Sequence, residues 1–173
     1  MSAYTVTIPC FTQMLSSLKG LLAKGEVHAS TLGYDPKNLL NSRLAPDMHT
    51  LATQVRFACT QAREAVDRLS GQSVITPDTP VSMSEAVALI DQTLHILAGA
   101  DRSLIERRAE DSITLELPGG IAFVMTGNEY AVNWATPQFY FHLMTAYSIL
   151  RHNGVPLGKA DYVPHMFAYL RKT

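Results

Sequence analysis

The sequence predicts an all-α fold: four main helices in a bundle, with a small β-hairpin before the last helix. Two observations predict it. Over most of the chain, apolar residues recur every three or four positions, as they do on the buried face of a helix. Between residues 112 and 126 they alternate instead with polar residues, as in a half-buried strand pair. The 173 residues suffice for one domain, 1–173, with its own core.

Composition argues against several classes of protein. The formal charge is −1 and the sequence pI is about 6.6, so no strong field favours nucleic acid. No run reaches the ~18 apolar residues of a membrane span, and the N-terminus lacks a signal sequence, so we expect a cytoplasmic protein without membrane association. Cys10 and Cys59 stand alone, which favours free thiols over a zinc site or a disulfide.

The first helix is predicted at about residues 8–30. Thr7 is a suitable N-cap, and Pro9 suits a first helical turn. One buried stripe follows from the spacing of Phe11, Met14, Leu15, Leu18, Leu21 and Leu22. The next connection is long and rich in Gly and Pro, with a short helical turn expected around residues 37–40.

A second helix is predicted at about residues 46–70. Its inward stripe begins at Leu51, and the position four residues earlier is Asp47. Counting in helical turns therefore places a carboxylate at the start of the core-facing stripe. His49 falls on the polar face instead, and we expect it to face solvent.

The third helix is predicted at about residues 82–100. Ser82 and Glu85 have the spacing of a capping box at its start. His95 lies away from the apolar stripe, which favours a solvated histidine. Residues 101–111 are highly charged and read as a connection, and the hairpin at 112–126 turns at Pro118-Gly119-Gly120.

The last helix is predicted at about residues 128–153, with Asn128 as its N-cap and Gly154 just past its end. Pro137 lies inside it and should kink or break it. This segment is apolar around much of its circumference, and only 17% of the whole chain is charged. Both features predict a homo-oligomer, most simply a dimer, that covers apolar surface.

Three motifs carry a resemblance to a known family. They are LNSRLAPDM at 40–48, LPGG at 117–120 and FYFHLMTAYSILRHNGVPLGK at 139–159. With them the chain resembles the DinB/YfiT-like four-helix-bundle superfamily, in a bacterial branch of unknown function. The likeness extends over nearly the whole chain, to about residue 162.

The resemblance implies a divalent-metal site of three histidines, one near the start of the second helix and an i, i+4 pair on the last. His142 stands at the first position of that pair, but the second position is Ala146, which has no ligating atom. Asp47 or His49 would supply the remaining ligand, and periodicity favours Asp47. Two ligands do not close a protein metal site, so Asp47 and His142 are only weak metal candidates. Several relatives are thiol-dependent transferases or isomerases. The resemblance therefore implies the same kind of activity for this chain.

Three hypotheses follow. In the first, the metal site is degenerate and a small molecule binds in a pocket lined by Asp47, Trp134, His142 and Tyr147, with Asp47 and His142 within reach of a hydrogen bond or one water. In the second, the chain is an enzyme that uses Asp47 and His142 with a metal or as an acid/base pair. In the third, it is a structural homodimer in which both side chains satisfy buried backbone groups, His142 at the carbonyl freed by Pro137.

Overall fold

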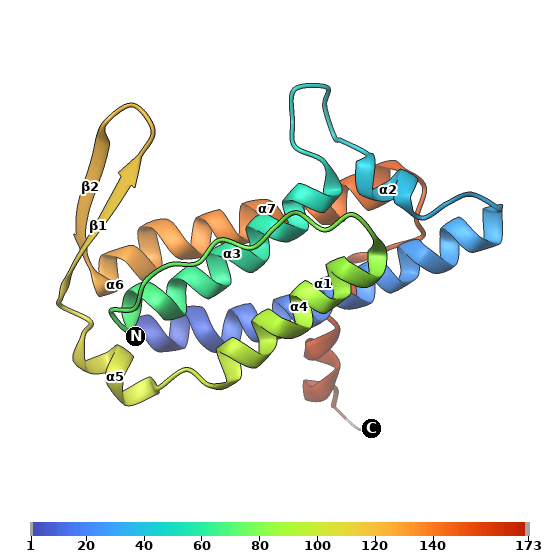
Figure 1. Cartoon of the computed structure of the whole chain (residues 1–173). Helices are drawn as coiled ribbons and strands as arrows, with labels where there is room; N and C mark the ends of the chain where they lie inside the picture. Colours follow the sequence, from blue (N-terminus) through green and yellow to red (C-terminus); the bar gives the residue numbers. More distant parts are fainter. Residues whose placement is uncertain (1, 172–173) are drawn as a thin grey trace.

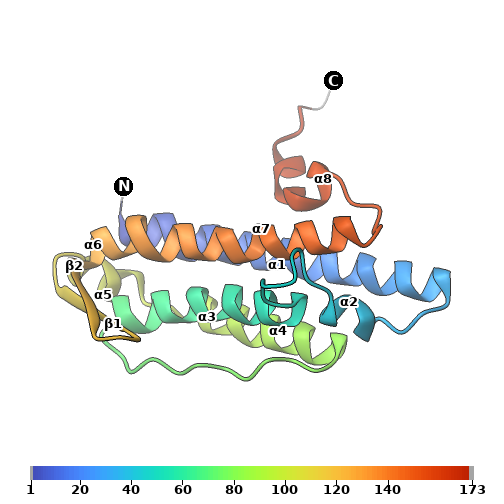
Figure 2. The same cartoon turned by 90° about the horizontal axis from the view of Figure 1, so that it is seen from above.

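The computed structural model describes residues 2–171, and four long helices pack side by side in it (Figures 1 and 2). They are α1 (Ala3–Leu32), α3 (Leu51–Leu69), α4 (Met83–Ala98) and α7 (Thr136–His152). Both α1 and α3 pack against α4 and against α7. The predicted all-α class is confirmed. Within the described residues, no helix is long and apolar enough to cross a membrane.

The core lies between these helices. The ring of Phe11 on α1 stacks on Phe139 of α7, with centroids 4.2 Å apart, and both side chains are fully buried. Leu15 and Leu18 of α1 and Leu51 of α3 are also fully buried. Each such side chain contributes about 1.5–3 kcal/mol of transfer free energy, so the predicted inward stripes hold the bundle together.

Helix α1 begins earlier than the sequence indicated. Ser2 is its N-cap and forms a capping box with Thr5, so the expected start at residue 8 is wrong. Pro9 consequently lies within the helix, where it has no N–H for the carbonyl of Thr5. The thiol of Cys10 donates to that carbonyl at 3.7 Å, which supplies a weak replacement. The half-buried Cys10 is thus a free thiol with a local role.

Helix α3 begins later than predicted. A short helix, α2 (Lys37–Asn41), forms in the first connection as expected, but residues 44–49 are not helical. Thr50 caps α3 by accepting the N–H of Thr53 at 3.4 Å, and the N–H of Leu51 donates to the carbonyl of Ser42 at 2.9 Å. The expected start at residue 46 is therefore wrong, and Asp47 lies outside the helix.

Helix α4 starts where the capping pattern placed it. Ser82 accepts the N–H of Glu85 at 3.2 Å, and Glu85 accepts the N–H of Val81 at 3.0 Å. The charged segment that follows was expected to be a connection, and the structure adds that it contains a short helix, α5 (Arg102–Arg107). Asp101 caps this helix by accepting the N–H of Leu104 at 3.0 Å.

The hairpin is confirmed. Strand β1 (Ser112–Leu117) pairs antiparallel with β2 (Ile121–Thr126), and Leu117 is the partner of Ile121 beside the turn. Gly119 and Gly120 have φ of 85° and 77°, which glycine adopts without strain. Ile113 and Leu115 of β1 are buried, whereas most of β2 is exposed.

The last helical segment is interrupted by a π-helical turn. It consists of α6 (Gly127–Tyr130), the π-turn η1 (Ala131–Ala135) and α7. The N-cap is Thr126, in a capping box with Glu129, and not Asn128 as expected. The irregularity expected at Pro137 takes the form of this π-turn, which directly precedes the α-helical turn that contains the proline. In it, the carbonyl of Ala131 accepts the N–H of Thr136 and also the hydroxyl of Thr136, the latter at 2.8 Å.

The chain after α7 turns back, contacts α1 and then projects from the side of the bundle (Figure 2). It forms α8 (Lys159–Tyr162) and the 3₁₀ turn η2 (Pro164–Tyr169). The carboxylate of Asp161 pairs with Lys24 of α1 at 2.5 Å, and the ring of Tyr162 meets that of Tyr147 edge-on at 5.7 Å. The tail therefore docks through Asp161 and Tyr162, whereas the apolar residues nearer its end, which the sequence suggested would dock, are exposed: Met166, Phe167, Tyr169 and Leu170.

We predict that replacing glycine by alanine has opposite effects on stability at two positions. A Cβ at Gly127 would lie 3.1 Å from the carbonyl oxygens of Arg108 and Ala109, so Gly127→Ala should destabilise by about 1–3 kcal/mol. A Cβ at Gly20, inside α1, meets nothing within 4 Å, so Gly20→Ala should stabilise by about 0.5–1 kcal/mol. Urea unfolding measures both, and equal effects of the two variants would contradict the close packing at Gly127.

Candidate functional site

His142 on α7 faces Gln54 on the neighbouring helix α3. Its Nδ1 lies 2.8 Å from Oε1 of Gln54, whose side chain is buried. The amide nitrogen of Gln54 donates to the backbone carbonyl of His49 at 3.5 Å, so Oε1 is left to accept. Nδ1 of His142 therefore carries the proton, and Nε2 presents its lone pair.

Aromatic rings and a cation surround this imidazole. The ring of Phe57 lies 4.7 Å from that of His142, and the ring of His49 lies 5.2 Å from Phe57 on α3. The guanidinium of Arg56 stands 4.3 Å from the centre of the Phe57 ring, in a cation–π arrangement. We call these five residues, His49, Gln54, Arg56, Phe57 and His142, the His142 cluster.

The environment holds His142 neutral. Burial, and to a smaller extent the electrostatic influence of His49 and Arg56, lower its pKa from the ordinary 6.5 to about 4. At pH 7 the imidazole is then an uncharged ring with one fixed tautomer. Such a ring is suited to accept a hydrogen bond at Nε2 from a ligand.

The residues present do not fit the metal site that the resemblance implied. Within residues 2–171, no three side chains of His, Cys, Asp or Glu are grouped so that they could hold a metal ion. Ala146 is fully buried at the position of the second histidine, and the ring of Phe57 contacts both imidazoles, His49 and His142. A phenyl ring there offers no ligand atom, so these residues do not form a metal site.

The structure separates the four side chains predicted to line one pocket. Asp47 is exposed in the connection before α3, because the helix that would have turned it inward starts at Leu51. Gln54, and not Asp47, is the partner of His142. Trp134 packs on Phe123 of the hairpin, with ring centroids 5.9 Å apart, and Tyr147 packs on Tyr162 of the tail.

His49 is exposed, as predicted, although the edge of its ring meets Phe57. His142 does not satisfy the carbonyl freed by Pro137, because its Nδ1 is bonded to Gln54. Sequence reasoning missed Gln54, although a signal was present. It lies three residues after Leu51 on the inward stripe of α3, where a lone polar side chain needs a partner.

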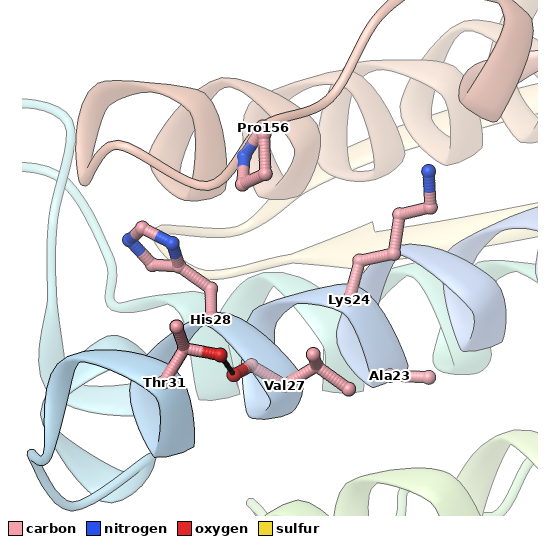
Figure 3. A pocket seen from close by; sticks show the side chains of 6 residues that line it. All are labelled: Ala23, Lys24, Val27, His28, Thr31 and Pro156. Atoms are coloured by element: carbon pink, nitrogen blue, oxygen red, sulfur yellow. Dashed lines mark hydrogen bonds between the residues drawn. The ribbon is translucent and has the colours of Figure 1, made fainter.

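A separate hollow lies between α1 and the chain that leaves α7 (Figure 3). Its volume is about 440 Å³, and its lining residues are Ala23, Lys24, Val27, His28, Thr31 and Pro156. In Figure 3 the imidazole of His28 and the ring of Pro156 stand at one end and Lys24 at the other. The ammonium of Lys24 is already paired with Asp161 and the hydroxyl of Thr31 with the carbonyl of Val27, so few polar atoms are free to orient a ligand.

Comparisons with known proteins identify the family. Residues 3–163 match the family described as Domain of unknown function (DUF1993). The crystal structure of a DinB family member protein from Shewanella denitrificans is similar, with 37% sequence identity over 92% of this chain and 90% of that chain, and a TM-score of 0.83. No curated protein matches significantly. The chain therefore belongs to the DUF1993 family, and its fold is that of the DinB-like helical bundles.

Proposed function

We propose that this protein binds a small molecule at the His142 cluster. The observation that supports this most is the state of the imidazole: it is neutral, and its Nδ1–H is committed to Gln54. Within residues 2–171, no side chain or backbone group of the protein bonds to Nε2. A half-buried acceptor of fixed orientation is the kind of polar group that orients a ligand in a binding site.

The surroundings define the chemistry of the ligand. Phe57 and Phe141 place aromatic rings beside the imidazole, at 4.7 and 5.3 Å between centroids. These rings favour a planar or apolar body, and Nε2 requires one hydrogen-bond donor on it. We therefore propose an uncharged ligand with an aromatic or aliphatic body and a hydroxyl, amide or thiol group.

Binding is better supported than acid/base catalysis. With a pKa of about 4, the imidazole is a weak base at pH 7, and only about one molecule in a thousand carries the proton needed to act as an acid. The second member of the expected acid/base pair is also missing, because the exposed Asp47 is not the partner of His142. Both points disfavour the transferase or isomerase alternative at this cluster.

A homodimer is the second candidate, as an assembly compatible with ligand binding. The observation that favours it is the outward face of α7, where Phe141 is 56% and Met144 44% exposed. The two side chains lie three residues apart, on one face of the helix, and an exposed apolar patch of this kind marks a surface that a partner can cover. The low charge content of the chain supports the same proposal.

We predict that p-cresol, a phenol with one hydroxyl donor, binds at the cluster and that His142→Asn weakens its binding about three- to tenfold. Asparagine keeps an N–H near the position of Nδ1 for Gln54 but removes the acceptor Nε2. Titration followed by the amide resonances of α3 and α7 measures the affinity.

Two controls make this test specific. His142→Gln places a side-chain carbonyl near the position of Nε2 and should retain more of the affinity than His142→Asn. Toluene, which lacks the hydroxyl, should bind wild type and both variants alike. If p-cresol binds wild type and His142→Asn equally, Nε2 is not the ligand acceptor.

We also predict a loss of stability in mild acid that depends on His142. The folded protein holds the pKa near 4, below the ordinary 6.5, so between these values the unfolded chain binds more protons. The contribution of this histidine is therefore complete above pH 6.5 and is lost as the pH falls towards 4. We expect it to be on the order of 1–2 kcal/mol, because partial exposure screens the effect.

Urea unfolding of wild type and His142→Asn at pH 7 and at pH 4.5 measures this difference. The variant should lose less stability than wild type on acidification. His95→Gln, at an exposed position on α4, controls for the removal of a histidine. Identical losses in wild type and His142→Asn would show that the imidazole is not held neutral in the folded protein.

A further inference from the structure

One segment of this protein carries almost no charge. From residue 117 to residue 150, which includes β2, α6, η1 and nearly all of α7, the only formally charged residue is Glu129. Its carboxylate is engaged, because it accepts the N–H of Thr126 at 2.8 Å in the capping box. About a quarter of the residues are charged in ordinary globular domains, so a single charged residue in this segment is a strong depletion of charge.

This uncharged segment is exposed along much of its length. Six large apolar side chains on it are 43–69% exposed: Ile121, Phe123 and Val124 on β2, Val132 on η1, and Phe141 and Met144 on α7. We call these six the apolar band. Exposed apolar surface without interspersed charge is characteristic of an interface and not of a face that meets water.

The hairpin extends the band beyond the bundle. Figure 1 shows it projecting from the end of the bundle where α6 begins. On its inward face, Ile113 and Leu115 are buried, but Ile121, nearer the tip, is 53% exposed. Side chains alternate between the two faces of a strand, so the tip continues a core-type face that nothing covers within the described residues of this chain.

Strand β2 is also an unprotected edge. Within residues 2–171 it pairs with β1 alone, and its sequence IAFVMT contains neither a charge nor a proline. Natural proteins usually protect such edges by one of these devices or by covering them. The hairpin therefore has the character of an arm that is covered in the assembled protein.

A receiving surface lies on α7. A hollow of about 390 Å³ is lined by Pro137, Gln138 and Phe141, on the outward side of the helix just after the π-turn. It is uncharged and has room for a large apolar side chain. It therefore matches the uncharged, apolar tip of the hairpin in chemistry.

We propose that two copies of this chain dock through the apolar band, with the hairpin tip of each against the outward face of α7 of the other. This inference rests on the homodimer proposed above and adds its surface and pairing. A two-fold axis uses each contact twice, so one arm and one receiving face per chain suffice.

Charge and area support a second copy as the occupant. A partner with charged groups would have to desolvate them against a surface that offers no counter-charge, whereas a second copy brings an equally uncharged surface. Val124 points to the opposite face of β2 from Ile121 and Phe123. The other five side chains expose about half of their area, on the order of 400 Å² together, and the polar residues between them extend the surface towards the ~800 Å² per partner of a stable interface.

The proposed dimer also closes the small-molecule site. The ring of Phe141 lies 5.3 Å from that of His142, so an arm seated on Phe141 would lie beside the His142 cluster. The partner copy would then contribute a wall to the site. The arm would shield the ligand from water, which strengthens a hydrogen bond to Nε2.

Light scattering of the full chain at about 50 μM tests the assembly. Wild type should have a mass of about 38 kDa, twice the 19.0 kDa of the chain. Ile121→Glu and Phe141→Arg should each give a folded monomer by circular dichroism. Val27→Arg, at a 67% exposed position of α1 outside the band, should remain a dimer.

Mixing the two band variants tests the pairing. In a heterodimer, Glu at position 121 of one chain meets Arg at position 141 of the other, while the second contact keeps the native pair. The mixture should therefore regain a mass near 38 kDa, although neither variant does so alone. A dimeric wild type whose mixture stays monomeric overturns the arm-to-helix pairing but leaves a homodimer intact, and a monomeric wild type overturns both.

Discussion

The position of Pro137 sets the geometry on which the last helix depends. Proline cannot donate to the carbonyl four residues back, and the chain responds with a π-turn over Ala131–Ala135 instead of ending the helix. A π-turn accommodates one extra residue, which rotates everything after it by about 100° relative to a continuous α-helix. The rotation decides that Phe139 faces the core, His142 faces α3 and Phe141 faces outward.

The His142 cluster shows how this geometry is converted into a chemical property. The imidazole of His142, turned towards α3, loses its hydrogen bonds to water, and Gln54 replaces only one of them. Because a neutral ring tolerates that loss better than an imidazolium, burial lowers the pKa. The same desolvation that makes this histidine a poor acid leaves its Nε2 as an acceptor whose orientation the protein has already fixed.

The sequence was sufficient for the fold class, because each element has a long periodic signal. Helix boundaries were less predictable where two signals compete. Pro46 and Thr50 can both start α3, and the bond from the N–H of Leu51 to Ser42 in the preceding connection, which periodicity cannot reveal, favours Thr50. Pro9 indicated a helix start, but capping at Ser2 and the thiol of Cys10 make it tolerable inside α1.

The candidate site was predictable only in part, because it also depends on where a helix begins. Because α3 starts five residues later than predicted, Asp47 is not on the inward stripe, whereas the proposal for His142 needed only its own position on α7. Trp134 and Tyr147 share a helical segment with His142, but the π-turn and the helical period point their rings towards the hairpin and the tail. Which partner each ring meets is a property of tertiary packing, which spacing along one helix does not encode.

Helix α7 is apolar around most of its circumference, and this links the small-molecule site to the assembly. Its inward face is covered by α1 and α3, and the side that carries His142 faces α3. The outward face, with Phe141 and Met144, remains exposed. Adjacent residues of one helix thus serve the two proposed contacts, His142 for the ligand and Phe141 for the second copy. Any ligand that touches both rings would interact with the dimer differently from the monomer, so the affinity of the ligand and the stability of the dimer would be thermodynamically linked.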